Sequence, residues 1–429
     1  MKVQAFFRFA QLLFALALAL RAGDAPAQSQ PAPQVLEVMH WWTSDGEHKA
    51  AAQLAAGFAA NGLKWQDAAV AGGGGIAAVK VLKSRVLMGD PPDVAQLIGS
   101  TLGEWAQAGL VYDLSAMAAR QRWSQNLHPL AMELITQQNR IVAAPLGIHR
   151  INTLLFNRKL FEKAGLTPPR NWSEFEAAVA AFQRMGIQPL AWSDEPWQLA
   201  TVFEAVLLGE AGAQGYIDLI KLRGNAAWSA PRAQASVSRA LTRLQTLRQS
   251  SGKTFAESPW VDGVRQLKEG NAAMLIMGDW AAGELVAWGA DPERDFGCVA
   301  VPGTQGMHLY SIDTLAMLVN PRHNSAGLEK AAQTIVSPAV QVAYNSAKGS
   351  IPVRRDTKPD LLDSCARNSW ESFTMRDAKR VPSLAHRMAA DDATKDAVAQ
   401  ILWRYLTQNN MNTATAQQRL ATVLRKPFP

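Results

Sequence analysis

The sequence is poor in cysteine and has no long apolar run. Only two of its 429 residues are cysteines, although 48% of them are hydrophobic. Two isolated cysteines without a Cys-x-x-Cys pair or a histidine cluster argue against a structural zinc site. They are also too few for a small domain held together by disulfides. No internal run reaches the roughly 18 apolar residues of a membrane-spanning helix, so a protein with many spans is excluded.

The motifs of nucleophilic and metal-dependent catalysis are also missing. The sequence has no G-x-S-x-G, no S-x-x-K with its partner motifs and no H-E-x-x-H. Its seven histidines never stand three or four residues apart, so a helical metal site is unsupported. We therefore predict no catalytic residue, no metal and no cofactor. A secreted carbohydrate-active enzyme with a carboxylate pair stays open as an alternative, because spacing cannot show whether two carboxylates face each other.

Phosphate and nucleic-acid binding find little support. Four glycines at 72–75 precede a predicted helix, where free backbone N–H groups could hold a phosphate. The Lys-Ser/Thr of a nucleotide-binding loop does not follow them, so we interpret the glycines as a flexible turn near a cleft. The net charge of +7 is modest and the basic residues are scattered. We therefore predict no nucleic-acid partner.

The N-terminus has the pattern of a secretory signal. Lys2 and Arg8 precede a short apolar stretch at 12–20, and an Ala-Pro-Ala site follows at 25–27. This predicts a signal peptide over 1–27, cleaved after Ala27, and a mature protein in the periplasm. An amphipathic N-terminal helix of a cytosolic protein is the alternative.

Export into an oxidising compartment would allow Cys298 and Cys365 to pair. Closing that loop would contribute roughly 3–4 kcal/mol of stability in the chain-entropy model. Two free buried thiols are the alternative.

Hydrophobic periodicity predicts two α/β lobes. In the first part of the chain, strands at 35–42, 63–70 and 93–98 alternate with helices at 46–60, 76–88 and 102–108. Such alternation is typical of a largely parallel sheet. Further strands are predicted at 139–148, 151–157, 187–192, 272–277, 296–301 and 314–319. Helices are predicted at 158–164, 173–184, 198–208, 231–249, 261–269, 392–408 and 413–425.

Tryptophan is unusually frequent, with 14 Trp beside only 5 Tyr. Several of them stand where a predicted strand ends or a helix begins: Trp41, Trp42, Trp192, Trp197, Trp260 and Trp280. Open α/β sheets bind ligands at the carboxyl ends of their strands. The large flat face of an indole is suited to stacking on a ligand ring. This placement predicts an aromatic-lined cleft.

Seven segments match a known family in the expected order. They are WWTSDGE (41–47), GGGGIAAVKVLKSRVLMGDPPDVAQ (72–96), PLGIHRIN (145–152), FNRKLFEKAGLTPPRNWSEFEAAVAAFQRMGIQPLA (156–191), IMGDWAAGE (276–284), KGSIPVR (348–354) and SLAH (383–386). In these segments the chain resembles the periplasmic sugar-binding proteins of bacterial ABC importers (extracellular solute-binding protein family 1). Among them it is most similar to the glucose-binding members.

The resemblance implies an α/β, two-lobe periplasmic binding protein fold of type II, with a cleft and hinge between the lobes. Lobe one would comprise 28–150 plus 311–347, and lobe two 151–310 plus 348–429. Crossovers would fall near 147–152, 308–313 and 346–351. The protein would be the solute-binding subunit of an ABC sugar importer, a monomer that presents a monosaccharide to a membrane permease. Glucose is favoured, with mannose, galactose, an oligosaccharide or a sugar acid as alternatives.

The resemblance also implies a set of ligand-binding residues. Trp260 and Trp280 would stack on the sugar from one lobe, and the other candidates would line it or bind its hydroxyls: Trp41, Trp42, Glu47, Gln96, Asp279, Asp313, Lys348 and His386. Trp197 is a further candidate, and His149 is expected to brace a crossover rather than to touch the sugar. One position departs from the glucose-binding pattern, because Ile98 stands where those proteins have Lys or His. The change removes a hydroxyl partner and leaves the identity of the sugar open.

Overall fold

A computed structural model of the chain describes residues 33–72, 75–251, 258–320, 325–408 and 410–426. The predicted signal peptide and two of the four consecutive glycines lie outside the described residues. By its contacts the chain divides into Met1–Gln34 and a second unit, Val35–Pro429. Of the helices and strands described below, only Gln34, the first residue of the first strand, belongs to the first unit. No helix in the described part of the chain is long and apolar enough to cross a membrane.

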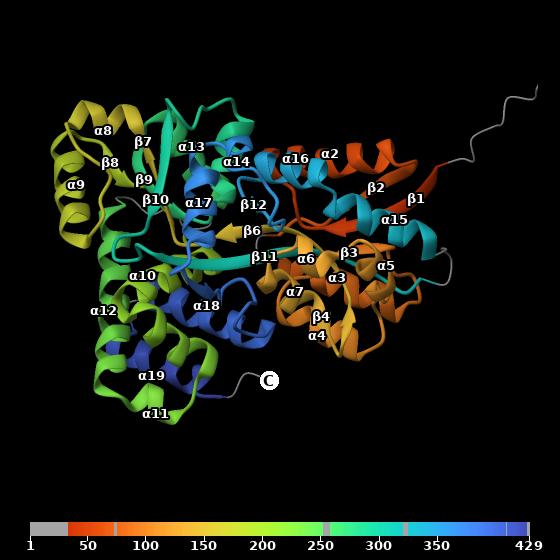
Figure 1. Ribbon diagram of the computed structural model, residues 1–429. Helices are drawn as coiled ribbons and strands as arrows, with labels where there is room; N and C mark the ends of the chain where they lie inside the picture. Colours follow the sequence, from red (N-terminus) through yellow and green to blue (C-terminus); the bar gives the residue numbers. More distant parts are fainter. Residues whose placement is uncertain (1–32, 73–74, 252–257, 321–324, 409, 427–429) are drawn as a thin grey trace, which may run out of the picture. The chain divides into compact units, whose positions relative to one another are not determined.

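The larger sheet has seven strands (Figure 1). Strands β1 and β3 run parallel, whereas β11 runs antiparallel to β3 and β6. The edge strand β12 pairs with β6, and β13 adds to the beginning of β11. In spatial order the strands are β12 (Ile351–Pro352), β6 (Ala144–Arg150), β11 (Met307–Met317), β3 (Val94–Gln96), β1 (Gln34–His40) and β2 (Leu63–Ala69), with β13 (Lys379–Pro382) beside β11.

A second sheet has four strands, in which β7 lies antiparallel to both β9 and β10. Its order is β10 (Phe296–Ala300), β7 (Thr153–Asn157), β9 (Ala272–Met277) and β8 (Gln188–Leu190). A separate hairpin joins β4 (Thr136–Gln137) and β5 (Arg140–Ile141). Every residue of β9 is buried, which is typical of a strand covered on both faces.

Helices flank both sheets. Around the first sheet lie α2 (Asp45–Ala60), α3 (Ile76–Leu87), α4 (Ser100–Gln107), α5 (Ser115–Arg120), α6 (Trp123–Asn126), α7 (Pro129–Ile135), α15 (Ser325–Val336) and α16 (Pro338–Lys348). Around the second lie α8 (Arg158–Ala164), α9 (Trp172–Arg184), α10 (Pro196–Tyr216), the π-helix η2 (Ile217–Leu222), α11 (Asn225–Ser229), α12 (Pro231–Ser250), α13 (Trp260–Glu269), α14 (Trp280–Ala287), α18 (Asp392–Thr407) and α19 (Thr413–Leu424). The short η3 (Pro359–Leu361) precedes α17 (Ser364–Thr374).

Polar residues set the start of several helices. Ser44 and Glu47 form a capping box at the beginning of α2. The Ser44 hydroxyl accepts from the backbone N–H of Glu47, and the Glu47 carboxylate accepts from the backbone N–H of Ser44. Asn157 and Asn171 cap α8 and α9 through their side-chain oxygens. The predicted helix starts are thus confirmed to within a few residues, because the capping residues are recognisable in the sequence.

The apolar side chains form two large cores and a smaller one. The first core joins buried apolar residues from Leu36 to Ile148 with others from Ile312 to Phe373. The second takes in most of the buried apolar residues between Ile151 and Leu309, together with those of the C-terminal helices. A third cluster packs α13, α14 and β9 together. The lobe boundaries predicted from the sequence stay a prediction, because the contacts place Val35–Pro429 in a single unit.

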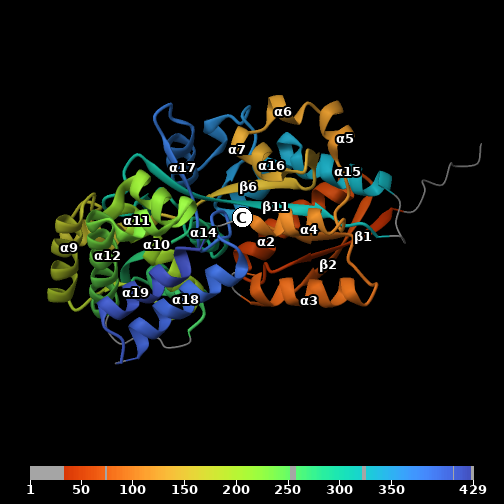
Figure 2. The same cartoon turned by 90° about the horizontal axis from the view of Figure 1, so that it is seen from below.

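Two long strands take part in both large cores. On β11, Leu309 packs in the second core and Ile312 in the first. Ile148 of β6 packs in the first core, and Ile151, just beyond β6, packs in the second. The strands lie side by side in both views and lead from one set of elements to the other (Figures 1 and 2). The sequence predicted only the second half of β11, because Ser311 and Asp313 interrupt its apolar pattern.

The segment after residue 347 differs from the predicted boundary. The sequence placed all of 348–429 in lobe two, yet β12 adds to the edge of the first sheet. Val353, Leu362 and Phe373 also contribute to the first core. The chain therefore stays with the first sheet until about the end of α17 and only then joins the second core. Two-residue strands such as β12 carry too little periodicity to be seen in a sequence.

Cys298 of β10 and Cys365 of α17 form a disulfide, with their Cα atoms 5.3 Å apart. No free cysteine is left in the chain. Of the two alternatives that the sequence left open, the structure has the paired form. The bond closes a loop between residues 67 positions apart.

We expect the disulfide to stabilise the fold by about 3–4 kcal/mol, since it restricts the unfolded chain. In urea unfolding, Cys298→Ser and the double variant Cys298→Ser/Cys365→Ser should lose the same free energy of unfolding. Dithiothreitol should destabilise the wild type and leave the double variant unchanged. If dithiothreitol leaves the urea midpoint of the wild type unchanged, the prediction is contradicted.

Candidate functional site

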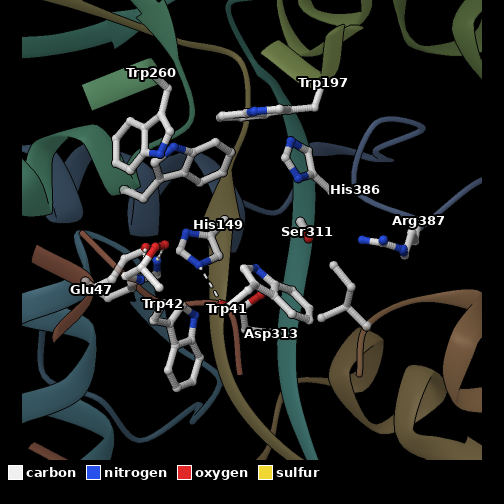
Figure 3. A pocket seen from close by; sticks show the side chains of 14 residues that line it. Trp41, Trp42, Glu47, His149, Trp197, Trp260, Ser311, Asp313, His386 and Arg387 are labelled. Carbon is white, nitrogen blue, oxygen red and sulfur yellow. Dashed lines mark hydrogen bonds and ion pairs between the residues drawn. The ribbon is translucent and has the colours of Figure 1, made fainter. Parts of the chain in front are cut away.

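A cavity lies between elements of the first and second cores, at the carboxyl end of β1 (Figure 3). The space in it open to the centres of water molecules is about 80 Å³. Since one buried water needs roughly 10–15 Å³ measured in this way, the cavity has room for a handful of waters or one small ligand. Its walls are made by Trp41, Trp42, Thr43, Glu47, Ile98, His149, Trp197, Trp260, Trp280, Ser311, Asp313, Lys348, His386 and Arg387.

Trp41 owes its position to a glycine and a buried amide. Its backbone N–H donates to Oε1 of Gln96, 3.4 Å away. A β-carbon on Gly75 would lie 2.8 Å from the Trp41 ring, so only glycine allows the backbone to pass this close. Gly75 also has a φ of 73°, which disfavours any other residue. The predicted turn of glycines thus supports one face of an indole.

Trp42 points into the first core. It is fully buried between the rings of His40 and Tyr344, at centroid distances of 4.8 and 5.7 Å. Its indole Nε1 has no hydrogen-bond partner. Trp42 borders the cavity, yet its contacts are mainly those of a core residue that fixes the end of β1 and the adjoining Trp41.

Three other tryptophans stand at the beginning of helices: Trp197 on α10, Trp260 on α13 and Trp280 on α14. The ring of Trp197 lies 6.5 Å from that of Trp260 and 6.3 Å from that of Trp280. A β-carbon on Gly278 would lie 2.2 Å from the Trp280 ring, so this indole too packs directly against the backbone of a glycine. In Figure 3, Trp197 and Trp260 face Trp41 and Trp42 across the cavity. The aromatic walls therefore oppose each other.

An ion pair joins α2 and α16 beside these rings. Nζ of Lys348 lies 2.8 Å from Oε1 of Glu47, and both side chains are largely buried. Oε2 of Glu47 also accepts from the backbone N–H of Thr43. Burial alone would raise the pKa of Glu47, but the Lys348 ammonium outweighs it and lowers the pKa. Glu47 is therefore ionised at neutral pH.

His149 is held between two carboxylates. Its Nδ1 lies 2.6 Å from Oδ1 of Asp279, and its Nε2 lies 3.3 Å from Oδ2 of Asp313. Each carboxylate accepts hydrogen bonds only, so both ring nitrogens carry protons and the imidazole is a cation. Burial opposes this charge, but Asp279 and Asp313 together raise the pKa of His149 to about 9. Asp313 keeps a lowered pKa in spite of its own burial, because it faces this imidazolium.

His386 behaves in the opposite way. Burial, followed by the neighbouring charges of His149 and Arg387, lowers its pKa to about 3, so its ring is neutral. Nε2 lies 3.2 Å from Oγ1 of Thr201, and the ring packs edge-on against Trp280 at 5.0 Å. The cavity wall thus contains a neutral imidazole close to a cationic one.

The loop that carries His386 is anchored by a buried carboxyl group. Glu204 of α10 accepts from the hydroxyl of Ser383 and from the backbone N–H of Leu384. Burial raises the pKa of Glu204 to about 7. This anchor fixes the loop against the second core and holds His386 at the cavity.

Comparison with known proteins identifies the family. The model for the bacterial extracellular solute-binding proteins matches residues 41–342. A "Probable sugar-binding periplasmic protein" of Brucella suis biovar 1 is 33% identical, over 95% of this chain and 96% of its own. The chain belongs to the bacterial extracellular solute-binding protein family.

Solved structures agree with this assignment. A bacterial solute receptor described as exclusive for β-D-galactopyranose matches with a TM-score of 0.78 at 17% identity, over 91% of this chain and 98% of its own. Maltose-bound MalE3 of T. maritima matches with a TM-score of 0.75 at 19% identity, over 91% of this chain and 99% of its own. The predicted α/β periplasmic binding protein fold of type II is confirmed. Because the family consists of solute-binding proteins, the protein is not an enzyme.

Most of the predicted residues of this solute-binding protein line its cavity, and two do not. Gln96 lies behind Trp41 and is 3% exposed. Asp279 lies behind His149, where its second oxygen accepts from the backbone N–H of Arg150. Gln96 and Asp279 each form a hydrogen bond with a residue of the cavity wall, and their contact with a solute stays a prediction. The sequence named both through the family resemblance, with Asp279 beside Trp280.

Four lining residues were not predicted as contacts: Thr43, His149, Ser311 and Arg387. The sequence assigned His149 only a bracing role at a crossover, and the structure gives it that role as well as a place on the wall. Ser311 lies two residues before Asp313 on β11, so the alternation of a strand puts both on one face. That signal was hidden because the strand itself was predicted too short. Among the described residues, no group of His, Cys, Asp and Glu side chains could hold a metal ion.

Elements of the two cores also touch on either side of the cavity. Oε2 of Glu284 on α14 accepts from the backbone N–H of Gly46 at the start of α2, at 2.9 Å. Close by, a β-carbon on Gly283 would lie 2.5 Å from the carbonyl oxygen of Lys348. On the other side, the backbone N–H of Ser100 donates to the carbonyl oxygen of Arg387. Contacts this close enclose the cavity.

The imidazolium between two aspartates predicts a pH dependence of stability. Between about pH 6.5 and 9 the folded protein keeps a proton on His149 that the unfolded chain has lost. The free energy of unfolding should therefore fall with rising pH in this window, by up to about 1.4 kcal/mol per pH unit. Below pH 6.5 both states hold the proton and the contribution is complete.

Urea unfolding at a series of pH values measures this slope. His149→Gln keeps a polar side chain without the charge and should flatten the curve between pH 6.5 and 9. His48→Gln, which removes an exposed histidine, should leave the wild-type slope in place. A His149→Gln curve parallel to that of the wild type would show that the imidazolium is absent.

Proposed function

We propose that the protein binds a monosaccharide in this cavity, as the periplasmic solute-binding subunit of an ABC sugar importer. The observation that carries the proposal is the convergence of opposed indole rings and buried charged groups on so small a space. The apolar faces of a pyranose suit stacking on Trp41 and Trp280. Its hydroxyls suit the fixed polar groups of Glu47, Lys348 and Asp313, because hydrogen bonds to charged groups are stronger than neutral ones.

The relatives support a sugar as the class of solute. The Brucella suis protein bears the name of a sugar-binding periplasmic protein, and the two structural neighbours are described with galactopyranose and with maltose. The size of the cavity favours one sugar ring over a longer chain. Glucose is our first choice on the strength of the sequence resemblance. The membrane permease of the importer would be the partner, and the binding protein itself would act as a monomer.

Ile98 should govern which sugar fits, because its apolar side chain lines the cavity and is 4% exposed. A hydroxyl that faced it would lose its hydrogen bonds to water without replacement, which costs about 1–3 kcal/mol. We therefore expect the preferred sugar to present a carbon-bound hydrogen or no substituent at this point. The selectivity between epimers should be set here.

Calorimetry on the chain from residue 28 tests the proposal with glucose, galactose, mannose, xylose and maltose. We expect one-to-one binding of a monosaccharide, weaker binding of maltose, and unchanged sugar after long incubation. Tight glucose binding would establish the proposed solute. Binding of another sugar in the panel would keep the transport role and replace glucose. No heat with any of them, from a folded protein, would refute the monosaccharide proposal.

Removal of an indole face should weaken binding in proportion to the stacking lost. We expect Trp280→Ala to reduce the affinity for the bound sugar at least tenfold, which is about 1.4 kcal/mol. Trp403→Ala is the matched control, since Trp403 packs against the second core and does not line the cavity. Equal losses in the two variants would show that Trp280 acts through stability alone.

The support of Trp41 by Gly75 can be separated from backbone strain. Gly75 and Gly89 both have a φ of 73°, but a β-carbon on Gly89 would meet no atom within 4 Å. Alanine at either position should therefore cost a similar stability, about 1 kcal/mol. Only Gly75→Ala should also displace the Trp41 ring and lower the sugar affinity. A sugar affinity that falls equally in Gly89→Ala would contradict this account.

A further inference from the structure

A second hollow lies on the other face of β6 from the solute cavity. Ile148 borders it, while the next residue, His149, borders the solute cavity, as the alternation of a strand requires. The space in it open to the centres of water molecules is about 640 Å³. We call it the basic groove, and its main side chains are His128, Arg354, Arg355, Trp370, Phe373 and Arg380.

Phe373 of α17 is the centre of the groove's floor. It is 1% exposed, and the ring of His128 packs on it at a centroid distance of 4.5 Å. The guanidinium of Arg380 lies 5.4 Å from the same ring. The backbone of His128 donates to the carbonyl oxygen of Val353, which ties the start of α7 to the segment that carries Arg355. The positions of these groups are thus fixed by the fold.

The positive charge of the groove is not balanced. No acidic residue of the described part of the chain lines it. Arg354 is paired with Asp356, whereas Arg380 bonds only to the backbone carbonyl oxygens of Phe373 and Met375. Within the described residues, the guanidinium of Arg355 forms neither a hydrogen bond nor an ion pair. Two guanidinium groups therefore face the same hollow without a carboxylate partner.

This excess of positive charge affects the pKa values of the two histidines around the floor, His128 and His308. Burial, with the charges of Arg380 and Arg355, lowers the pKa of His128 to about 4. Burial, with Arg150, Arg380 and His128, also lowers the pKa of His308, which packs edge-on against Phe373 at 4.9 Å. His308 is fully buried, and its Nε2 has no hydrogen-bond partner among the described residues. An anion in the groove would oppose the part of each shift that the arginines cause.

We propose that the basic groove binds a small oxyanion, a carboxylate or a phosphate, between the guanidinium groups of Arg355 and Arg380. Planar guanidinium groups match the paired oxygens of these anions and bind them through two parallel hydrogen bonds. The rings of Trp370 and Phe373 give an apolar surface for the carbon skeleton of an organic acid. The site is separate from the solute cavity, and the proposal does not depend on which solute that cavity takes.

His128 provides a built-in reporter for the test. The imidazole signals of the full mature chain are followed by NMR between pH 3 and 7, with His128→Gln to assign its resonance. Inorganic phosphate and citrate are added in separate titrations, at constant ionic strength. An anion seated near the ring should raise the pKa of His128 by about 1–3, with a saturable dependence on concentration.

Arg355→Ala is the decisive variant, because this exposed side chain holds no contact on which folding depends. It should abolish the saturable shift or weaken anion binding at least tenfold. Arg294→Ala removes the same charge from an exposed pair with Asp291 and is the matched control. A response to citrate alone would identify a carboxylate site, and a response to phosphate a phosphate site. A shift that does not saturate, or that is equal in Arg355→Ala and Arg294→Ala, would overturn the proposal.

Discussion

The pairing of His149 with Asp279 and Asp313 is the interaction on which the site depends. It brings three ionisable groups together where water is nearly absent, on elements of both sheets: β6 and β11 of the first, and the turn after β9 of the second. A buried charge that loses its partner is strongly destabilising, so none of the three groups can leave without the others. The cluster therefore links the position of Trp280, next to Asp279, to that of the β11 residues across the cavity.

The two aromatic walls are built in the same way, because in each of them a glycine without a side chain lies against an indole ring. Gly75 lies against Trp41, and Gly278 lies against Trp280. Each ring is thereby held from behind and presents its other face to the cavity. Polar groups complete this arrangement from the gaps between the rings, with an ion pair on one side and a neutral histidine on the other. Such a surface is already organised before a ligand arrives, so little entropy is lost on binding.

The sequence predicted the order of strands and helices well, because periodicity and capping residues are local signals. Ser44, Asn157 and Asn171 mark helix starts that the structure has within a few residues. Of the site, the five tryptophans at element ends and the residues of the family motifs could be found. What escaped was decided by tertiary contacts. The second role of His149 needs two aspartates that are distant in sequence, and the beginning of β11 is masked by its own polar residues. Gln96 and Asp279 belong to the family motifs, yet in the structure they lie next to lining residues and not on the cavity wall itself.

The bond between Cys298 and Cys365 has a mechanical consequence. Cys298 lies in a strand of the second sheet, whereas α17, which carries Cys365, also sends Ala366 and Phe373 into the first core. A covalent link of fixed length between two bodies can lie only close to the line about which they turn. We therefore expect any opening of the two cores to pivot near this bond. The disulfide thus restricts the geometry of motion in the folded protein as well as the freedom of the unfolded chain.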